Sequence, residues 1–332
     1  MKVDYNILND FKRYMKEGDI EKQKPLSDNT VRVYLNTAKL FIDFLNENNL
    51  ELVDHKQGTK FLLYLKNNKN YKETSLMKEK MAIITFYKFL DIPFVKWKIG
   101  TTTIKEPNWF KSKKDIFKIL KYCINIRDMT ILTIVYESAL RVSEVHKLNV
   151  SDIVNINENW FLRLVKPKKQ EFEYTLVPLF PSSQLLLGKY LEVRKKQIIN
   201  YLKETNSNLS FTDVVPLFIN SDIGRLSYSE IQHIFKMASK RAGFDITNIH
   251  SLRHSRCTHL ILQGMSLAKV SRFMRHKNIE TTMRYFHWVG IDALDETMIK
   301  KEVDKTNTNK EKGKKTDALF ELAISSLLSN IS

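Results

Sequence analysis

The chain contains only two cysteines and nine glycines among its 332 residues. Cys123 and Cys257 cannot form a disulfide scaffold, and so few thiols are typical of the reducing cytoplasm, where we expect this protein to be located. None of the glycines belongs to a GxxxxGKS/T or GxGxxG loop. The usual phosphate-binding loops are therefore excluded, and chemistry driven by a nucleotide is not expected.

Long apolar runs are also absent. No segment approaches the ~18 uninterrupted apolar residues of a membrane span, and no apolar stretch follows a basic start at the N-terminus. We therefore expect neither a membrane anchor nor a secretory signal. With 43% hydrophobic residues the chain can still form globular cores, and its length of 332 residues predicts two domains.

Acidic residues are scarce relative to basic ones. The chain has 54 Lys and Arg against 37 Asp and Glu, so its formal net charge is +17. A surplus of this size attracts polyanions and favours a nucleic-acid partner. Charge alone leaves open the alternative of a lysine-rich, solvated surface.

The spacing of apolar residues predicts a helical domain over residues 1–95. Ser27 is a candidate N-cap ahead of a stripe of apolar residues spaced three or four apart. A second such pattern begins after Thr74, and shorter apolar stretches span residues 7–14 and 61–65. Four short helices with lysines on their outer faces suit contact with DNA, although an ordinary bundle with a wet surface has the same pattern.

Prolines and a glycine interrupt the helical pattern and predict a linker over residues 96–112. A second domain is predicted over residues 113–298. Its first two helices are expected to be capped by Asp115 and Asp128.

The pattern changes from helical to extended between residues 160 and 179. Two stretches, 161–165 and 174–179, are rich in β-branched and aromatic residues and flank a basic stretch, which predicts a β-hairpin with a basic tip. The second domain is thus expected to be mainly α-helical with a small antiparallel β-sheet. Further helical patterns begin at Ser182, Ser227, Lys240 and Ser266.

Residues 299–332 predict a basic flexible arm and a C-terminal amphipathic helix. Seven lysines and three acids lie between residues 300 and 315. The helix, predicted over residues 318–331, has four apolar side chains on one face: Phe320, Ile324, Leu327 and Ile331. A tethered helix of this kind suits docking into a groove of a neighbouring molecule. Folding back onto its own domain is an equal alternative.

Five of the eight histidines lie between residues 250 and 287. His250 and His254 have the spacing of zinc ligands on a helix, but Arg253 between them would repel a cation. Anion recognition explains the same residues better. An arginine fork grips two phosphate oxygens at once, and a histidine one turn away can exchange a proton near neutral pH. Such a pair would form half of a phosphoryl-transfer site, although a helix face with satisfied polar side chains explains the pentapeptide 250–254 equally simply.

A second arginine, Arg141, lies at a predicted helix boundary with Glu144 three residues on. Glu144 either orients Arg141 or forms a simple surface pair with it. Further along the chain, His276 precedes Tyr285 by nine residues.

Together these motifs resemble those of the tyrosine recombinases, the integrase family that includes phage-type integrases and Xer-type resolvases. The resemblance covers residues 113–290 and, more loosely, the helical N-terminal domain. It rests on separated motifs in the right order: Ala139–Glu144, His250-x-x-Arg253-His254, Thr258-His259-Leu260 with Gly264, and His276 with Tyr285. One departure is Met274-Arg275, which replaces the usual Leu-Gly of the family. Arg275 either adds a phosphate contact or only alters a turn.

The resemblance implies a role for each motif residue. Tyr285 would be the nucleophile that attacks the scissile phosphate, forms a 3′-phosphotyrosine and releases a 5′-hydroxyl. Arg141 and Arg253 would clamp the non-bridging oxygens, and His276 would hydrogen-bond to the phosphate. His250 would take the proton from Tyr285 or return it. Because the covalent ester conserves the energy of the broken strand, neither metal nor ATP nor any other cofactor is expected.

The family also uses a lysine on a β-hairpin to protonate the leaving 5′ oxygen. Lys168 is our choice for this acid, with Lys166 and Lys169 as alternatives.

The resemblance further implies a two-domain clamp around double-stranded DNA. Its helical N-terminal bundle would bind the core of a specific recombination site, and four protomers would exchange their C-terminal helices. Two other hypotheses remain: a nicking and closing enzyme like type IB topoisomerases, which would use the same residues, and a catalytically silent DNA-binding relative.

Overall fold

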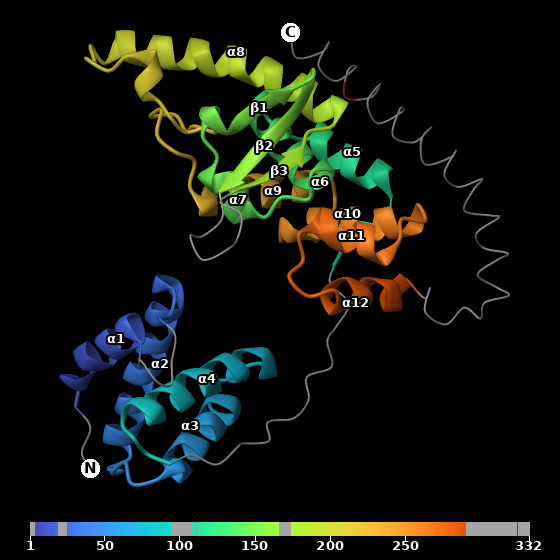
Figure 1. Cartoon of the computed structure of the whole chain (residues 1–332). Coiled ribbons are helices and arrows are strands. Elements are labelled where there is room, and N and C mark those ends of the chain that lie inside the picture. The colour runs from blue at the N-terminus through green and yellow to red at the C-terminus, as the bar shows by residue number, and fades with distance from the viewer. Residues whose placement is uncertain are drawn as a thin grey trace, which may run out of the picture. The chain divides into compact units, whose positions relative to one another are not determined.

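The computed structural model describes residues 4–18, 25–93, 108–110, 112–165, 174–289 and Ile324. It divides into two compact units, Met1–Lys105 and Glu106–Ser332 (Figure 1). Most of the predicted linker and C-terminal arm lies outside the described residues. In the part of the chain that the structure describes, no helix combines the length and apolar character needed to cross a membrane.

The first unit is the predicted bundle of four helices, which are α1 (Ile7–Glu17), α2 (Asp28–Glu47), α3 (His55–Asn67) and α4 (Glu73–Phe89). Helix α4 packs against the other three. Ser27 caps α2, since its side chain accepts a hydrogen bond from the Thr30 backbone N–H. Aromatic rings fill the core, where Phe86 meets Phe11 edge to face with ring centroids 4.9 Å apart.

Truncation of Phe86 tests this aromatic core. The side chain is 0% exposed, so we expect Phe86→Ala to lower the free energy of unfolding of this unit by about 3–5 kcal/mol. Met81→Ala on the same helix is the control, because Met81 is 46% exposed and should change stability by less than about 0.5 kcal/mol. Urea unfolding measures both. Equal effects of the two substitutions would contradict the packing.

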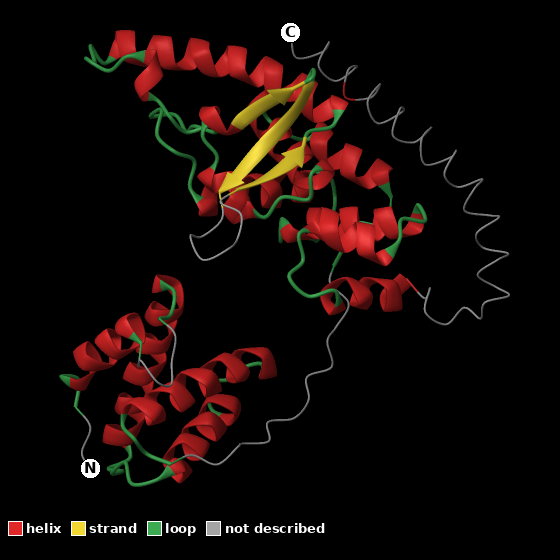
Figure 2. Ribbon diagram, in the orientation of Figure 1, coloured by secondary structure: helices red, strands yellow, loops and turns green. Residues whose placement is uncertain are grey.

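The second unit consists of helices around a small sheet (Figure 2). In chain order its elements are α5 (Lys113–Lys121), α6 (Ile126–Glu137), α7 (Val142–Lys147), the short 3-10 helix η1 (Val150–Asp152), β1 (Ile153–Ile156), β2 (Asn159–Val165), β3 (Tyr174–Pro178), α8 (Pro181–Glu204), η2 (Phe211–Asp213), α9 (Tyr228–Arg241), α10 (His250–Leu262), α11 (Leu267–Met274) and α12 (Glu280–Val289). The predicted fold class, mainly α-helical with a small antiparallel sheet, is confirmed.

The sheet has the order β1-β2-β3 with both pairings antiparallel. Its β2–β3 pair is the predicted hairpin, in which Leu162 pairs with Val177. Strand β1 was not predicted. It is only four residues long and its outer half, Asn155 and Ile156, is exposed, so it has too little alternation to be recognised in sequence.

Three predicted helix boundaries are wrong. Ser112 and Asn125, not Asp115 and Asp128, are the N-caps of α5 and α6, because each accepts a hydrogen bond from the backbone N–H of the later aspartate, at 3.2 and 2.8 Å. No helix begins at Lys240, which lies in the last turn of α9. Gly243 follows with φ of 80°, a left-handed conformation that ends the helix.

Helix α6 is the centre of the second unit. All of its residues except Arg127 are buried, and it contacts α5, α7, α8, α9 and α10. Ile324 is 0% exposed and belongs to the same hydrophobic core. The sequence left two alternatives for the C-terminal segment: docking into a neighbouring molecule or folding back. The structure places the Ile324 side chain in the core of its own chain.

Candidate active site

Helix α10 brings the predicted site residues together. It packs against α6, α11 and α12, so His250 and Arg253 on α10 lie near the α6–α7 connection, the end of α11 and Tyr285 on α12. Lys166, Lys168 and Lys169 lie outside the described residues.

Arg141 is the N-cap of α7 and is held by Glu144. The carboxylate accepts hydrogen bonds from the Arg141 backbone N–H at 2.7 Å and from its guanidinium at 2.8 Å. A second guanidinium nitrogen donates to the Arg275 carbonyl at 3.2 Å. Burial disfavours the charge on Glu144, but Arg275, the backbone N–H and Arg141 outweigh it and lower the pKa of this carboxyl. Glu144 therefore orients Arg141 rather than forming a simple surface pair.

Arg253 is buried and joins three segments. Its guanidinium donates to the backbone carbonyls of Ala139, before α7, and Met274, at the end of α11. Burial, together with Arg141 and Arg275, lowers the pKa of Arg253 to about 9, which still leaves it charged at neutral pH. The guanidinium is thus fixed in place by the backbone of the protein itself.

Arg275 stands where the family usually has the glycine of Leu-Gly, and the structure shows what it does there. The residue adopts a left-handed conformation, with φ of 54°, which glycine takes without strain. Its side chain is 14% exposed and turns inward, where it pairs with Glu144 at 3.1 Å and donates to the Ala139 carbonyl at 2.7 Å. Glu144 therefore bridges two arginines, and Arg275 both alters the turn and supports the site.

Two substitutions at position 275 separate these effects. Arg275→Ala and Arg275→Gly both remove the cation that faces Glu144 and Ala139, so both should lower the free energy of unfolding. Glycine tolerates the positive φ and should recover about 1 kcal/mol relative to alanine. Denaturant unfolding of the pair measures the difference. Equal stabilities would show that the left-handed backbone carries no strain.

Tyr285 is 6% exposed and lies between two histidines. Its hydroxyl is hydrogen-bonded to Nδ1 of His254. Its ring stacks on that of His276, with centroids 6.2 Å apart and planes 15° apart. Burial raises the pKa of the Tyr285 phenol, so the side chain is protonated at neutral pH and needs a proton acceptor in order to act as a nucleophile.

His276 is held by Thr282, whose Oγ1 lies 2.8 Å from the imidazole Nδ1. His250 is the first residue of α10, and its backbone N–H donates to Asn248 at 3.0 Å. Burial and the cations Arg253 and Arg141 lower the pKa of His250. Among the hydrogen bonds of the described residues, none joins His250 to Tyr285.

The partner of Tyr285 is therefore His254, which the sequence motif includes but to which no role was assigned. Its one signal in the sequence is its position directly after Arg253. The packing of α10 against α12, which creates the contact, cannot be inferred from that spacing. The zinc alternative for His250 and His254 lacks support, since the described ranges contain no cluster of three metal-ligating side chains.

A cationic groove of about 800 Å³ opens beside these residues. It is lined from α7, from strands β2 and β3 and from the α11–α12 region. Six cationic side chains face it: Arg141, Lys147, Arg163, Arg272, Arg275 and Lys277. Among the described residues that line the groove, the acids are Glu144 and Asp152. Glu144 is paired with arginines, and Asp152 is paired with Arg163 at 3.3 Å. Such a groove suits a polyanionic ligand such as a DNA backbone.

Comparisons with known proteins show the family of the chain. The model of the phage integrase family matches residues 110–289, and that of the phage integrase N-terminal SAM-like domain matches residues 8–91. The chain belongs to the phage integrase family.

Relatives of this integrase are named tyrosine recombinases. It is 26% identical over 305 residues to tyrosine recombinase XerC of Oceanobacillus iheyensis, covering 88% of this chain and 95% of the relative. It is 27% identical over 282 residues to tyrosine recombinase XerD of Staphylococcus epidermidis, covering 81% and 90%.

Solved structures share the fold of this integrase. The Tn1549 transposon integrase in complex with transposon right end DNA has a TM-score of 0.62 at 14% identity, covering 84% of this chain and 94% of that one. The XerH site-specific recombinase bound to difH substrate has a TM-score of 0.59 at 16% identity, covering 86% and 93%.

Two site histidines are expected to make the stability of this protein depend on pH. Burial, with nearby His250 and Arg253, lowers the pKa of His254 to about 4, and burial, Arg253 and Arg141 do the same for His276. Between pH 6.5 and about pH 4 the unfolded chain therefore binds more protons than the folded one. We expect the free energy of unfolding to fall as pH drops through this window.

Urea unfolding at several pH values measures this loss. His276→Asn should make it smaller, because one of the two depressed imidazoles is then missing. A variant that loses stability as steeply as the wild type would contradict the assignment.

Proposed function

We propose that this integrase is a site-specific DNA recombinase that cuts and rejoins strands through a covalent 3′-phosphotyrosine at Tyr285. The observation that carries the proposal is the position of the Tyr285 hydroxyl. The hydroxyl is hydrogen-bonded to His254, which follows Arg253 on α10. The Tyr285 ring stacks on the ring of His276, which lines the cationic groove. A nucleophile, proton carriers and phosphate-binding guanidiniums thus lie in one cluster.

The chemistry follows from these groups. The phenol oxygen attacks phosphorus, the bond from phosphorus to the 5′ oxygen breaks, and the strand remains attached through its 3′ phosphate. Negative charge develops on the non-bridging oxygens, where Arg141 and Arg253 would stabilise it. His276 would contribute a further hydrogen bond to the phosphate, and a histidine of the cluster would take the proton from Tyr285. Because one phosphoester replaces another, religation needs no external energy.

A hairpin lysine would protonate the leaving 5′ oxygen, and Lys168 remains our choice over Lys166 and Lys169. The described ends of the hairpin support this proposal. Val165, the last residue of β2, and Thr175 of β3 both line the cationic groove. Both described ends of the hairpin therefore lie at the groove that contains Arg141.

Covalent capture tests the proposal. Nicked duplexes with randomised arms are incubated with the protein, and adducts that resist denaturation are recovered and sequenced. The nick lets a short 5′-hydroxyl fragment diffuse away, so the intermediate accumulates. We expect adducts with the wild type and with Tyr228→Phe, which changes an exposed tyrosine on α9. Tyr285→Phe should form none and still bind DNA.

Adducts that persist in Tyr285→Phe would mean that another residue is the nucleophile. Relaxation of supercoiled DNA that lacks any captured site would favour the nicking and closing alternative. DNA binding without adducts in the wild type would favour a catalytically silent relative.

Double-stranded DNA with a specific site is the proposed substrate. In support, XerH was solved bound to its difH substrate, and a lambda integrase tetramer was solved bound to a Holliday junction, with a TM-score of 0.57 to this chain. The unit over residues 1–95 would bind the core of the site and the catalytic unit over 113–298 would cut it. A cytoplasmic location is part of the proposal, consistent with the free thiols of Cys123 and Cys257.

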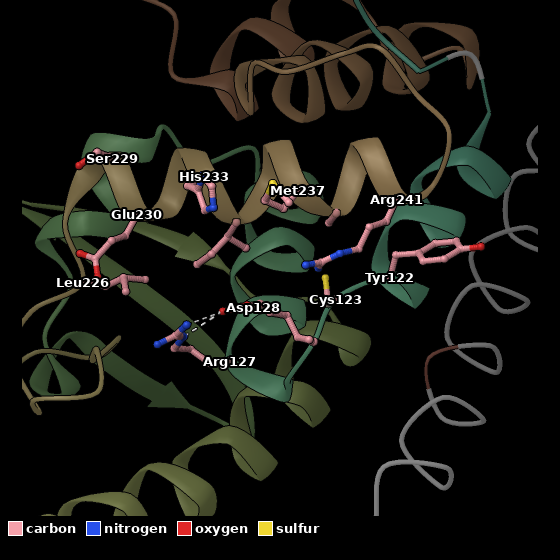
Figure 3. Close-up of a pocket in the computed structure, with 13 residues that line it drawn as sticks. Tyr122, Cys123, Arg127, Asp128, Leu226, Ser229, Glu230, His233, Met237 and Arg241 are labelled. Atoms are coloured by element: carbon pink, nitrogen blue, oxygen red, sulfur yellow. Dashed lines mark hydrogen bonds and ion pairs between the residues drawn. The ribbon is translucent and has the colours of Figure 1, made fainter.

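We also propose a homotetramer on DNA in which the C-terminal segments are exchanged. Ile324 of a single chain fills its own core, and the same side chain would fill the equivalent core of a neighbour. An open pocket of about 530 Å³ lies between α9 and the α5–α6 connection (Figure 3). Leu226 and Ala238 line this pocket and belong to the core that receives Ile324. The pocket thus offers room for more of the segment.

A further inference from the structure

The phenol of Tyr285 has one hydrogen-bond partner in the described site, Nδ1 of His254. Because the phenol is protonated, it is the donor, and Nδ1 of a neutral imidazole is the acceptor. The ring proton of His254 is then on Nε2. The bond thus already lies along the path that the phenol proton must take when the oxygen attacks phosphorus.

The surroundings keep the His254 imidazole neutral and able to accept. The side chains around this imidazole come from three places. His250 and Arg253 lie on the same helix, Tyr285 lies on α12, and His276 lies in the turn before α12. Burial and the two α10 neighbours lower the pKa of His254 to about 4 in the free protein. A bound phosphodiester brings negative charge next to Arg253 and Arg141, which raises the basicity of the imidazole when the proton has to move.

We propose that His254, rather than His250, accepts the Tyr285 proton during strand cleavage and returns it during religation. The inference rests on the proposed function. In the step, the bond between the Tyr285 oxygen and phosphorus forms as the bond to the 5′ oxygen breaks. The phenol proton passes to Nδ1 of His254, and the leaving 5′ oxygen takes its proton from the hairpin lysine. Religation reverses each transfer.

In this arrangement His250 would interact with the phosphate instead of with Tyr285. It begins α10, one turn before His254, and the charges that act on it are those of Arg253, Arg141 and Glu144. Arg253 and Arg141 are the proposed phosphate clamp, and Glu144 holds Arg141. A hydrogen bond from His250 to a non-bridging oxygen fits this position without a contact to Tyr285.

Two substitutions of His254 separate proton transfer from positioning. His254→Asn places an amide oxygen near the position of Nδ1, so it can still accept a bond from Tyr285 but cannot take up the proton. His254→Ala removes both functions. His250→Asn is the matched change one turn away. Each variant is first checked for wild-type unfolding and DNA affinity, and single-turnover cleavage is then measured on the captured site.

The substrate is made in two forms, with oxygen or sulfur at the bridging 5′ position. A thiolate leaves without protonation, so the sulfur substrate removes the need for the lysine acid and leaves the need for a base at Tyr285. We expect both His254 variants to cleave about 10²–10⁴-fold more slowly than the wild type on both substrates. The deficit of a variant lacking the hairpin lysine should disappear with sulfur.

Other results overturn the inference. Wild-type cleavage by His254→Asn would reduce His254 to a positioning residue, and faster cleavage by His254→Ala would make the bond an inhibitory latch. Rescue of either variant by sulfur would place His254 on the leaving-group side. In each case adducts of the wild type through Tyr285 still support the recombinase proposal, whereas adducts in Tyr285→Phe would overturn that proposal itself.

Discussion

The site depends on the two backbone carbonyls that hold Arg253. A guanidinium that donates to Ala139 and Met274 at once ties the connection before α7 to the end of α11, and its own helix carries the partner of Tyr285. Both flanking turns are left-handed at non-glycine residues, with φ of 50° at Ala139 and 54° at Arg275. Such turns persist only where surrounding contacts fix them, and here the buried arginines supply those contacts.

Crowding of positive charge is the second constraint. Among the described residues, Arg141, Arg253 and Arg275 share the carboxylate of Glu144 as their nearby counter-charge. Desolvation and mutual repulsion lower the pKa of Arg253 and of Arg275 and those of the three site histidines. A phosphodiester in the groove would relieve this repulsion, so part of its binding free energy would come from the fixed arrangement of these side chains.

Much of the fold could be predicted from the sequence. Helical periodicity and the extended stretches around the basic tip predicted the bundle and the hairpin, because these signals are local. The wrong caps at Asp115 and Asp128 came from residues with the right chemistry three positions too late. Strand β1 was too short to show alternation. The inward turn of Arg275 and the bond from Tyr285 to His254 depend on contacts between distant segments, which no local pattern encodes.

The burial of Tyr285 also bears on fidelity. A protein searching a genome meets about 10⁶ or more non-specific sites for each correct one. With 6% of its surface exposed, the phenol is shielded by the surrounding side chains from the phosphates that the protein would pass during such a search. If Tyr285 is the nucleophile proposed above, its burial would limit damage to the wrong strands before any discrimination between bases takes place.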